Sequence, residues 1–146
     1  MHSFIHHLMQ DHNTQRNIGE RLKQAKLPED RKKLREKMST ELLPHMAGEE
    51  ASIFAYMRGS RVQAANEHAL EAIQEHHVAR IVLQEILSLS PDSEVFSAKA
   101  AVLFELNKHH MEEEEGTHFP WLEANASKEQ LDALFEDYKA AEKAAE

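Results

Sequence analysis

The stretch PHMAGEEASIFAY, residues 44–56, decides how this chain is interpreted, because it places a histidine four residues before a glutamate. His45 is followed by Glu49 and then by a second carboxylate, Glu50. In a helix, residues four apart lie on one face with Cβ atoms about 6 Å apart. An imidazole and a carboxylate at this spacing can therefore share one cation.

A second stretch, HHMEEEEGTHFPW at residues 109–121, repeats the pattern with His110, Glu114 and Glu115. One histidine–glutamate pair is a weak signal, since such pairs are common on solvent-facing helices. Two pairs in one chain make a metal site the first hypothesis.

The composition predicts a nearly all-helical protein. The 146 residues suit one domain, residues 1–146, and Ala, Glu, Leu and Lys are abundant beside four glycines and four prolines. We expect an all-α, up-down-up-down four-helix bundle with a core over about residues 1–125 and an additional C-terminal helix over about 127–145. The four long helices are predicted over 3–25, 29–57, 62–87 and from about residue 96 onward.

Local signals set the details of these helices. Pro44 is predicted to kink the second helix, and Gly116 with Pro120 to end the fourth. Ser127 and Gln130 form a capping box that opens the last helix. The apolar residues of that helix are expected to cover the bundle from outside: Leu131, Leu134, Phe135 and Tyr138.

Charge and cysteine content exclude several classes of function. With 26 acidic and 17 basic residues, the formal charge of −9 repels phosphate backbones and anionic lipids, so neither nucleic acid nor membrane is an expected partner. The absence of cysteine rules out disulfides and thiolate sites. No leader segment or apolar span is apparent, and a cytoplasmic location is expected.

Counting residues along the predicted helices places one histidine of each helix at a similar height along the bundle axis. Short connections make consecutive helices antiparallel neighbours, so residues equally far from a shared turn lie side by side. His12 and His45 are about 15 and 17 residues from the first turn, or about 22 to 26 Å at 1.5 Å per residue. The same count aligns His45 with His76, and His76 with His110.

One layer would then collect a histidine from each helix and a glutamate from two. Buried carboxylates without a partner cost several kcal/mol each, which a cation would offset. Four imidazoles and two carboxylates are too many for one tetrahedral zinc ion but suit two bridged ions. Nitrogen and oxygen ligands without sulfur favour iron, then manganese or zinc.

The ordered motifs resemble the hemerythrin-like, or HHE cation-binding, domain over about residues 1–125. They are D-H (Asp11, His12), H-x-x-x-E-E (His45, Glu49, Glu50), E-H (Glu75, His76) and H-x-x-x-E-E followed by F-P (His110, Glu114, Glu115, Phe119, Pro120). The resemblance implies two iron ions, oxo- or hydroxo-bridged, in a four-helix bundle. It assigns His12, His45, His76 and His110 as terminal ligands, with Glu49 and Glu114 bridging.

The resemblance also implies a function: binding of, or response to, O2, NO or peroxide at an open iron position. Oxygen carriers of the family have an extra histidine near the third-helix ligand, where this chain has Ala72 and Arg80, so simple oxygen transport is not expected. Peroxide turnover would need a proton donor that the sequence does not identify, and enzyme activity is left open. The alternatives are iron storage or sensing, repair of iron centres, and a helical interaction module with a structural zinc ion.

Some assignments have rivals in the sequence. His77 competes with His76, and His109 with His110. His118, one turn past Glu114, is either an extra ligand or a residue at the rim of the site. The remaining glutamates of the acidic run are expected to face solvent: Glu112, Glu113 and Glu115.

Overall fold

The computed structural model of residues 1–146 is helical throughout and contains no strand, which confirms the all-helical prediction. A π-helical turn, η1, lies between α5 and α6. The elements in order are α1 (Ser3–Gln24), α2 (Pro28–Ala51), α3 (Ile53–Arg58), α4 (Gln63–Ser88), α5 (Phe96–Glu113), η1 (Glu114–His118), α6 (Phe119–Asn125) and α7 (Lys128–Ala144).

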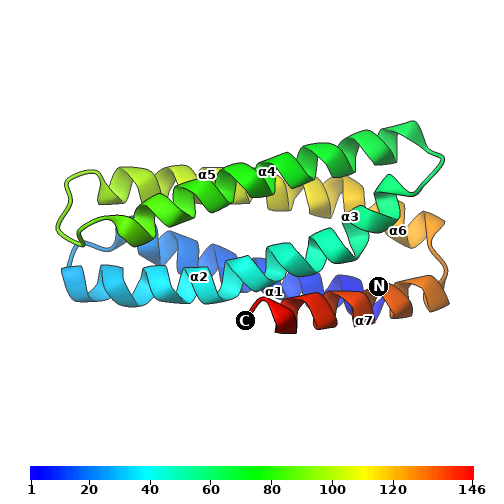
Figure 1. Ribbon diagram of the computed structural model, residues 1–146, viewed down its shortest axis with the longest axis horizontal. Coiled ribbons are helices and arrows are strands. Elements are labelled where there is room, and N and C mark those ends of the chain that lie inside the picture. The colour runs from blue at the N-terminus through cyan, green and yellow to red at the C-terminus, as the bar shows by residue number, and fades with distance from the viewer.

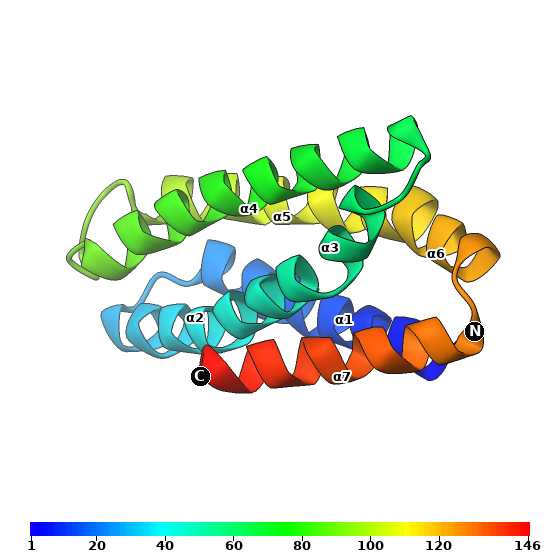
Figure 2. The ribbon, with the colours of Figure 1, turned by 45° about the vertical axis from the view of Figure 1, so that its right-hand side comes forward.

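Four long helices, α1, α2, α4 and α5, lie side by side and alternate in direction (Figures 1 and 2). Helix α1 packs against both α2 and α5, and α4 packs against α5. The last helix, α7, lies along α2, and its start carries the predicted capping box of Ser127 and Gln130. No helix has the length and apolar character that a membrane span requires.

The second long helix breaks at Ser52, a position that the sequence analysis did not identify. Helix α2 continues through Pro44, although this residue lacks the backbone N–H of one helical bond. At Ser52 the backbone leaves the helical region, with φ −120° and ψ −91°. The Ser52 hydroxyl donates to the Gly48 carbonyl at 2.6 Å, a back-bond that bends helices. The chain resumes as α3 in a new direction.

The sequence predicted that Gly116 and Pro120 end the fourth long helix, but the chain stays helical through both residues. Five residues form the π-helical turn η1, and the Phe119 N–H donates to the Glu114 carbonyl five residues back. Pro120 then follows as the second residue of α6, which continues directly from η1. Because the chain stays helical to Asn125, Gly116 is an interior helical residue.

Two apolar clusters fill the interior, one on each side of a polar layer. The first includes Phe4, Leu8, Phe54 and Tyr138, and the second includes Leu22, Leu42, Leu83 and Phe96. Between them in sequence, each long helix contributes buried polar residues. The polar layer therefore has an apolar cluster on each side along the helix axes.

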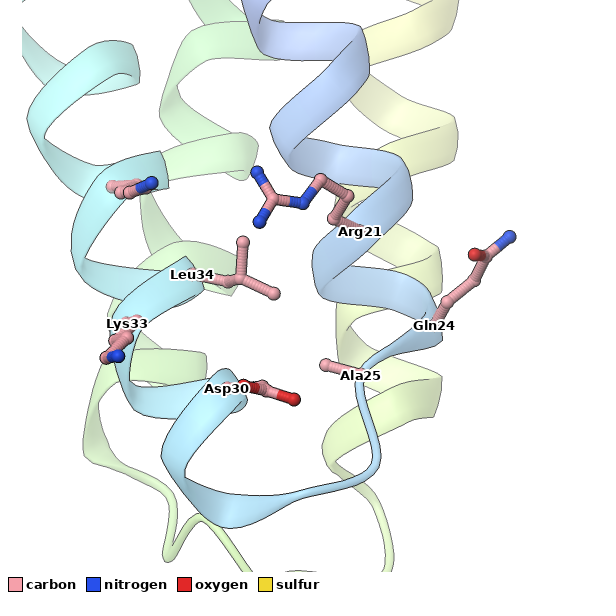
Figure 3. Close-up of a pocket in the computed structure, with 7 residues that line it drawn as sticks. Arg21, Gln24, Ala25, Asp30, Lys33 and Leu34 are labelled. Carbon is pink, nitrogen blue, oxygen red and sulfur yellow. The ribbon is translucent and has the colours of Figure 1, made fainter.

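A separate surface pocket of about 330 Å³ lies where α1 passes into α2 (Figure 3). It is lined by charged side chains that include Arg21, Asp30 and Lys33. None of the predicted metal ligands borders this pocket, so it plays no part in the site described next.

Candidate metal centre

The structure brings all six predicted ligands into the polar layer. Helix α1 supplies one, α2 supplies two, α4 one, α5 one and η1 one, and every one of these residues is at most 5% exposed. We call them the central residues: His12, His45, Glu49, His76, His110 and Glu114.

The two glutamates lie between two pairs of imidazoles. Glu49 is 3.3 Å from the His45 Nε2 through one oxygen and 3.1 Å from the His76 Nε2 through the other. Glu114 Oε1 lies 3.1 Å from the His12 Nε2 and 3.3 Å from the His110 Nε2. Candidate ligand atoms therefore form two groups: His12, His45, Glu49 and Glu114 in one, and Glu49, His76 and His110 in the other.

Several of these atoms lack partners that the protein itself can supply. Both oxygens of Glu49 and one of Glu114 are buried without a hydrogen bond of acceptable geometry. The Nε2 atoms of His76 and His110 face one another at 3.0 Å. Buried carboxylates and opposed imidazole nitrogens are unfavourable unless protons or cations lie among them. The donor set fits cations held by nitrogen and oxygen.

A second set of carboxylates fixes the outer nitrogen of every central histidine. The Nδ1 atoms donate to side chains at 2.6 to 2.9 Å, and each pair joins two helices: His12 to Glu115, His45 to Asp11, His76 to Glu50 and His110 to Glu75. We call these four acids the outer carboxylates. Each one is adjacent in sequence to a central residue of its own helix but holds the histidine of the next helix, so the four bonds form a closed ring around the site.

The outer carboxylates orient the imidazoles. Burial raises the pKa of each of these acids, but hydrogen bonds from the histidines outweigh burial and lower the pKa below its usual value. An ionised carboxylate is only an acceptor, so each Nδ1 must carry hydrogen and each Nε2 points inward. This is the arrangement in which histidines ligate metals.

Two arginines pair with outer carboxylates, and the position of one of these acids, Glu115, differs from the prediction. Glu115 was expected to face solvent, yet it accepts two hydrogen bonds at 2.8 Å from the Arg16 Nη2 as well as the bond from His12. Arg80 pairs with Glu50 at 2.7 Å in the same way. The sequence signal for both acids was the second glutamate of each H-x-x-x-E-E motif.

Inside the ring, the charges of the central residues shift one another's pKa values. Burial lowers the pKa of His45 and His110, but the charges of Glu49 and Glu114 outweigh it and raise both values well above the usual 6.5. Burial raises the pKa of Glu49, whereas the charge of the nearby His45 brings it well below its usual range. The Glu49 carboxylate is thus anionic and attracts either protons or metal cations.

Helix α7 reaches the site, contrary to the expectation that it would only cover the bundle. Tyr138 is fully buried, and its hydroxyl donates to Asp11 at 2.8 Å and lies 2.9 Å from the His45 Nδ1. Gly48 makes this approach possible, because a Cβ there would lie 2.5 Å from the Tyr138 ring. The tyrosine therefore fixes Asp11, which in turn fixes His45.

The structure separates the rival histidines from the central ones. His77 is exposed on the outer face of α4, and the His109 side chain is 63% exposed. His118 is buried, but its ligand atoms converge with those of His68 and Glu113. Glu112 is exposed, as predicted, and Glu113 is half-buried.

Aromatic rings close the layer against water. Phe54 packs against His76 and His110 with ring centroids 5.3 and 6.1 Å apart. Phe119 stacks on His12 at 5.5 Å. Both phenylalanines are at most 2% exposed, so these imidazoles contact apolar surface on one side and carboxylates on the other.

The helical fold and this buried set of histidines and glutamates define a class: a helical protein with a site that can hold metal cations. A family model, the hemerythrin HHE cation binding domain, matches residues 3–122. The chain belongs to that family, and the resemblance inferred from the motifs is confirmed. No curated protein and no solved structure matches the chain. Helix α7, with Tyr138, lies outside the matched residues.

Proposed function

We propose that this chain is a non-haem di-iron protein that binds or responds to O2, NO or peroxide at an open coordination position. In this proposal the up-down-up-down bundle of α1, α2, α4 and α5, with α7 as the additional helix, holds two iron ions. The ligands would be the four central histidines, with Glu49 and Glu114 shared between the ions. Manganese or zinc could occupy the same donors.

One observation carries the proposal: two buried glutamates lie between two pairs of inward-facing imidazoles, and three of their four oxygens have no hydrogen-bond partner. A single ion would leave part of this set without a partner. Two ions would use both imidazole pairs and both carboxylates. Bound iron would supply redox change and direct ligation of a small molecule.

The protein side chains would perform the remaining tasks. The outer carboxylates keep the Nδ1 hydrogens in place and the Nε2 lone pairs directed inward. Phe54 and Phe119 exclude water from the imidazoles. The Tyr138 hydroxyl holds its proton, because burial and the nearby Asp11 charge raise its pKa far above the usual 10.0. It would thus serve as a fixed hydrogen-bond donor.

The test is metal analysis combined with absorption spectroscopy. Iron-loaded protein should contain two iron ions per chain and absorb in the near ultraviolet, and azide, peroxide or NO should change the spectrum. His45→Ala and Glu114→Ala should lose iron, whereas His77→Ala, an exposed histidine on the same fold, should not. Retention of both ions in the first two variants would contradict the ligand assignment.

The same experiment separates the alternatives. A structural zinc protein would have no such absorption and no response to these ligands. An iron store or sensor would also bind iron, and transfer of that iron to a partner would distinguish it. A catalase assay on the iron-loaded protein would then separate peroxide turnover from binding.

A further inference from the structure

A second group of candidate ligands lies outside the central residues. It consists of His68 on α4, Glu113 at the end of α5 and His118 at the end of η1. One nitrogen or oxygen atom from each lies within 4.8 Å of the other two. Three different segments of the chain therefore direct metal-binding atoms at a common point.

The strongest observation concerns His118. This residue is only 1% exposed, and neither of its ring nitrogens has a hydrogen-bond partner in the protein. Burying an imidazole costs free energy unless its nitrogens are paired. Every central histidine meets this requirement through an outer carboxylate, whereas His118 has none. Its nitrogens require a ligand that the chain does not provide.

His118 does not belong to the central residues. In a regular α-helix, a residue four positions after Glu114 would share its face. Here, however, His118 ends the π-helical turn, and its ligand atoms converge with those of His68 and Glu113 rather than with either central group. Phe54 contacts the rings of His76, His110 and His118 with centroids 5.3, 6.1 and 6.2 Å apart, and thus lies among them.

The rest of the group has free coordination capacity. His68 is half-buried, makes no hydrogen bond, and its ring meets that of His118 at a centroid distance of 5.5 Å. Glu113 is paired at 3.3 Å with His109, whose side chain is 63% exposed. Such a surface pair is weak, so a cation can compete for this carboxylate.

A pocket of about 250 Å³ gives access to the group from solvent. His68 and His118 both border it, together with Val62, Ala65 and Trp121. The Glu113 side chain is also 34% exposed. A divalent cation therefore has an entry path that does not pass through the central residues.

We propose that His68, Glu113 and His118 form a second, mononuclear cation site. Two imidazoles and one carboxylate, without sulfur, form the donor set that holds Zn²⁺ or Fe²⁺ with an open fourth position. The site takes one such ion, with water or a small anion completing its coordination. Its existence does not depend on which metal occupies the central residues.

The experiment adds Zn²⁺ to iron-loaded, full-length protein and counts both metals per chain after dialysis. Wild-type protein should retain one zinc ion in addition to its iron. His68→Gln and His118→Gln should each lose that zinc, with iron content and near-ultraviolet absorption unchanged. His77→Gln, which changes an exposed histidine of the same helix, should retain it.

Three results would overturn the proposal: no additional zinc in the wild-type protein, zinc retained in both variants, or iron lost from His118→Gln. The last result would assign His118 to the central residues. If the wild-type chain takes up no iron, the count is made with zinc alone. Each of the two variants should then hold one zinc ion fewer than the wild-type protein and His77→Gln.

Discussion

His45 and His118 are almost equally buried, at 3% and 1% exposure, yet their surroundings are opposite. The Nδ1 of His45 donates to Asp11 at 2.9 Å and lies beside the Tyr138 hydroxyl, while its Nε2 faces Glu49. Neither nitrogen of His118 has a hydrogen-bond partner. Burial alone therefore does not identify the role of a histidine, whereas the partner of its outer nitrogen does.

The same contrast appears in the pKa values. Burial lowers the pKa of both histidines. At His45 the charge of Glu49 outweighs burial and the pKa rises well above 6.5, whereas at His118 burial dominates and the pKa falls. Carboxylates thus favour positive charge at the central residues, whereas burial favours the neutral imidazole of His118.

The largest expected effect comes from Glu49→Gln. Glu49 belongs to both groups of central ligand atoms, so replacing its carboxylate weakens both ion positions together. We expect the variant to lose most of its iron, measured as iron per chain after dialysis. Glu71→Gln, an exposed change on α4, should keep the wild-type content. Wild-type iron content in Glu49→Gln would show that this carboxylate is not shared.

The stability of the metal-free protein should depend on pH in a direction set by the central histidines. The raised pKa values of His12, His45 and His110 stabilise the fold fully below the unfolded value of about 6.5, and this contribution is lost as pH rises through the folded values. The lowered pKa of His118 acts oppositely, favouring the fold above 6.5. Three histidines with raised pKa values outweigh one with a lowered value, so the free energy of unfolding should fall as the pH rises above 6.5.

Urea unfolding of chelator-treated protein across this pH range measures the effect. Iron-loaded protein should not show the same fall, because metal binding requires deprotonated imidazoles and is favoured at higher pH. NMR titration of the histidines in the metal-free protein offers a direct check. A His118 that titrates above pH 6.5, or a His45 that titrates below it, would contradict the opposite pKa shifts of these two histidines.

Glu115→Gln tests whether the outer carboxylates set the metal affinity. The change removes the charge that holds the His12 Nδ1 at 2.6 Å and leaves Arg16 without its charged partner. Loss of such an orienting group typically lowers metal affinity by about 10- to 100-fold. Competition with a chelator measures this change, and Glu112→Gln, exposed in the same acidic run, is the matched control. Equal metal affinities in the two variants would show that the outer carboxylate Glu115 does not influence metal binding.

Gly48→Ala tests the contact between α2 and α7. The added Cβ would lie 2.5 Å from the Tyr138 ring, so the ring must move away from Asp11 and His45. Overpacking of this kind costs about 1–3 kcal/mol in the free energy of unfolding. Gly116→Ala is the control, because no atom lies within 4 Å of its added Cβ. That helical position should instead gain about 0.4–1 kcal/mol, and equal effects at both glycines would show that α7 is loosely packed.

The sequence predicted the helices and the six central residues because both follow from spacing. Helical periodicity identifies the buried face, and counting from a shared turn gives the height of His12 or His76 along its neighbour. The partner of an outer nitrogen depends on something else, the rotation of each helix about its own axis. Spacing does not contain that rotation, so Glu115 was assigned to solvent although it holds His12.

The π-helical turn and the role of α7 escaped prediction for related reasons. The π-helical turn at Glu114–His118 is not marked by any clear change in composition, so helical spacing did not predict where His118 would lie. Tyr138 follows the same apolar spacing as Leu131 and Leu134, which pack as ordinary core residues. Its hydroxyl gains a role from Asp11 on α1, 127 positions away in the chain.

Tyr138→Phe isolates that hydroxyl and should have the smallest effect. The ring, its contact with Gly48 and its packing on Phe4 remain, and Asp11 keeps its bond from His45. One hydrogen bond should therefore be lost, worth about 0.5–1.5 kcal/mol in the free energy of unfolding measured with urea. Because Asp11 becomes less constrained, His45 should hold its metal slightly less tightly, but iron content should not change. If Tyr138→Phe were as destabilising as Gly48→Ala, the hydroxyl rather than the ring packing would fix α7 to the metal centre.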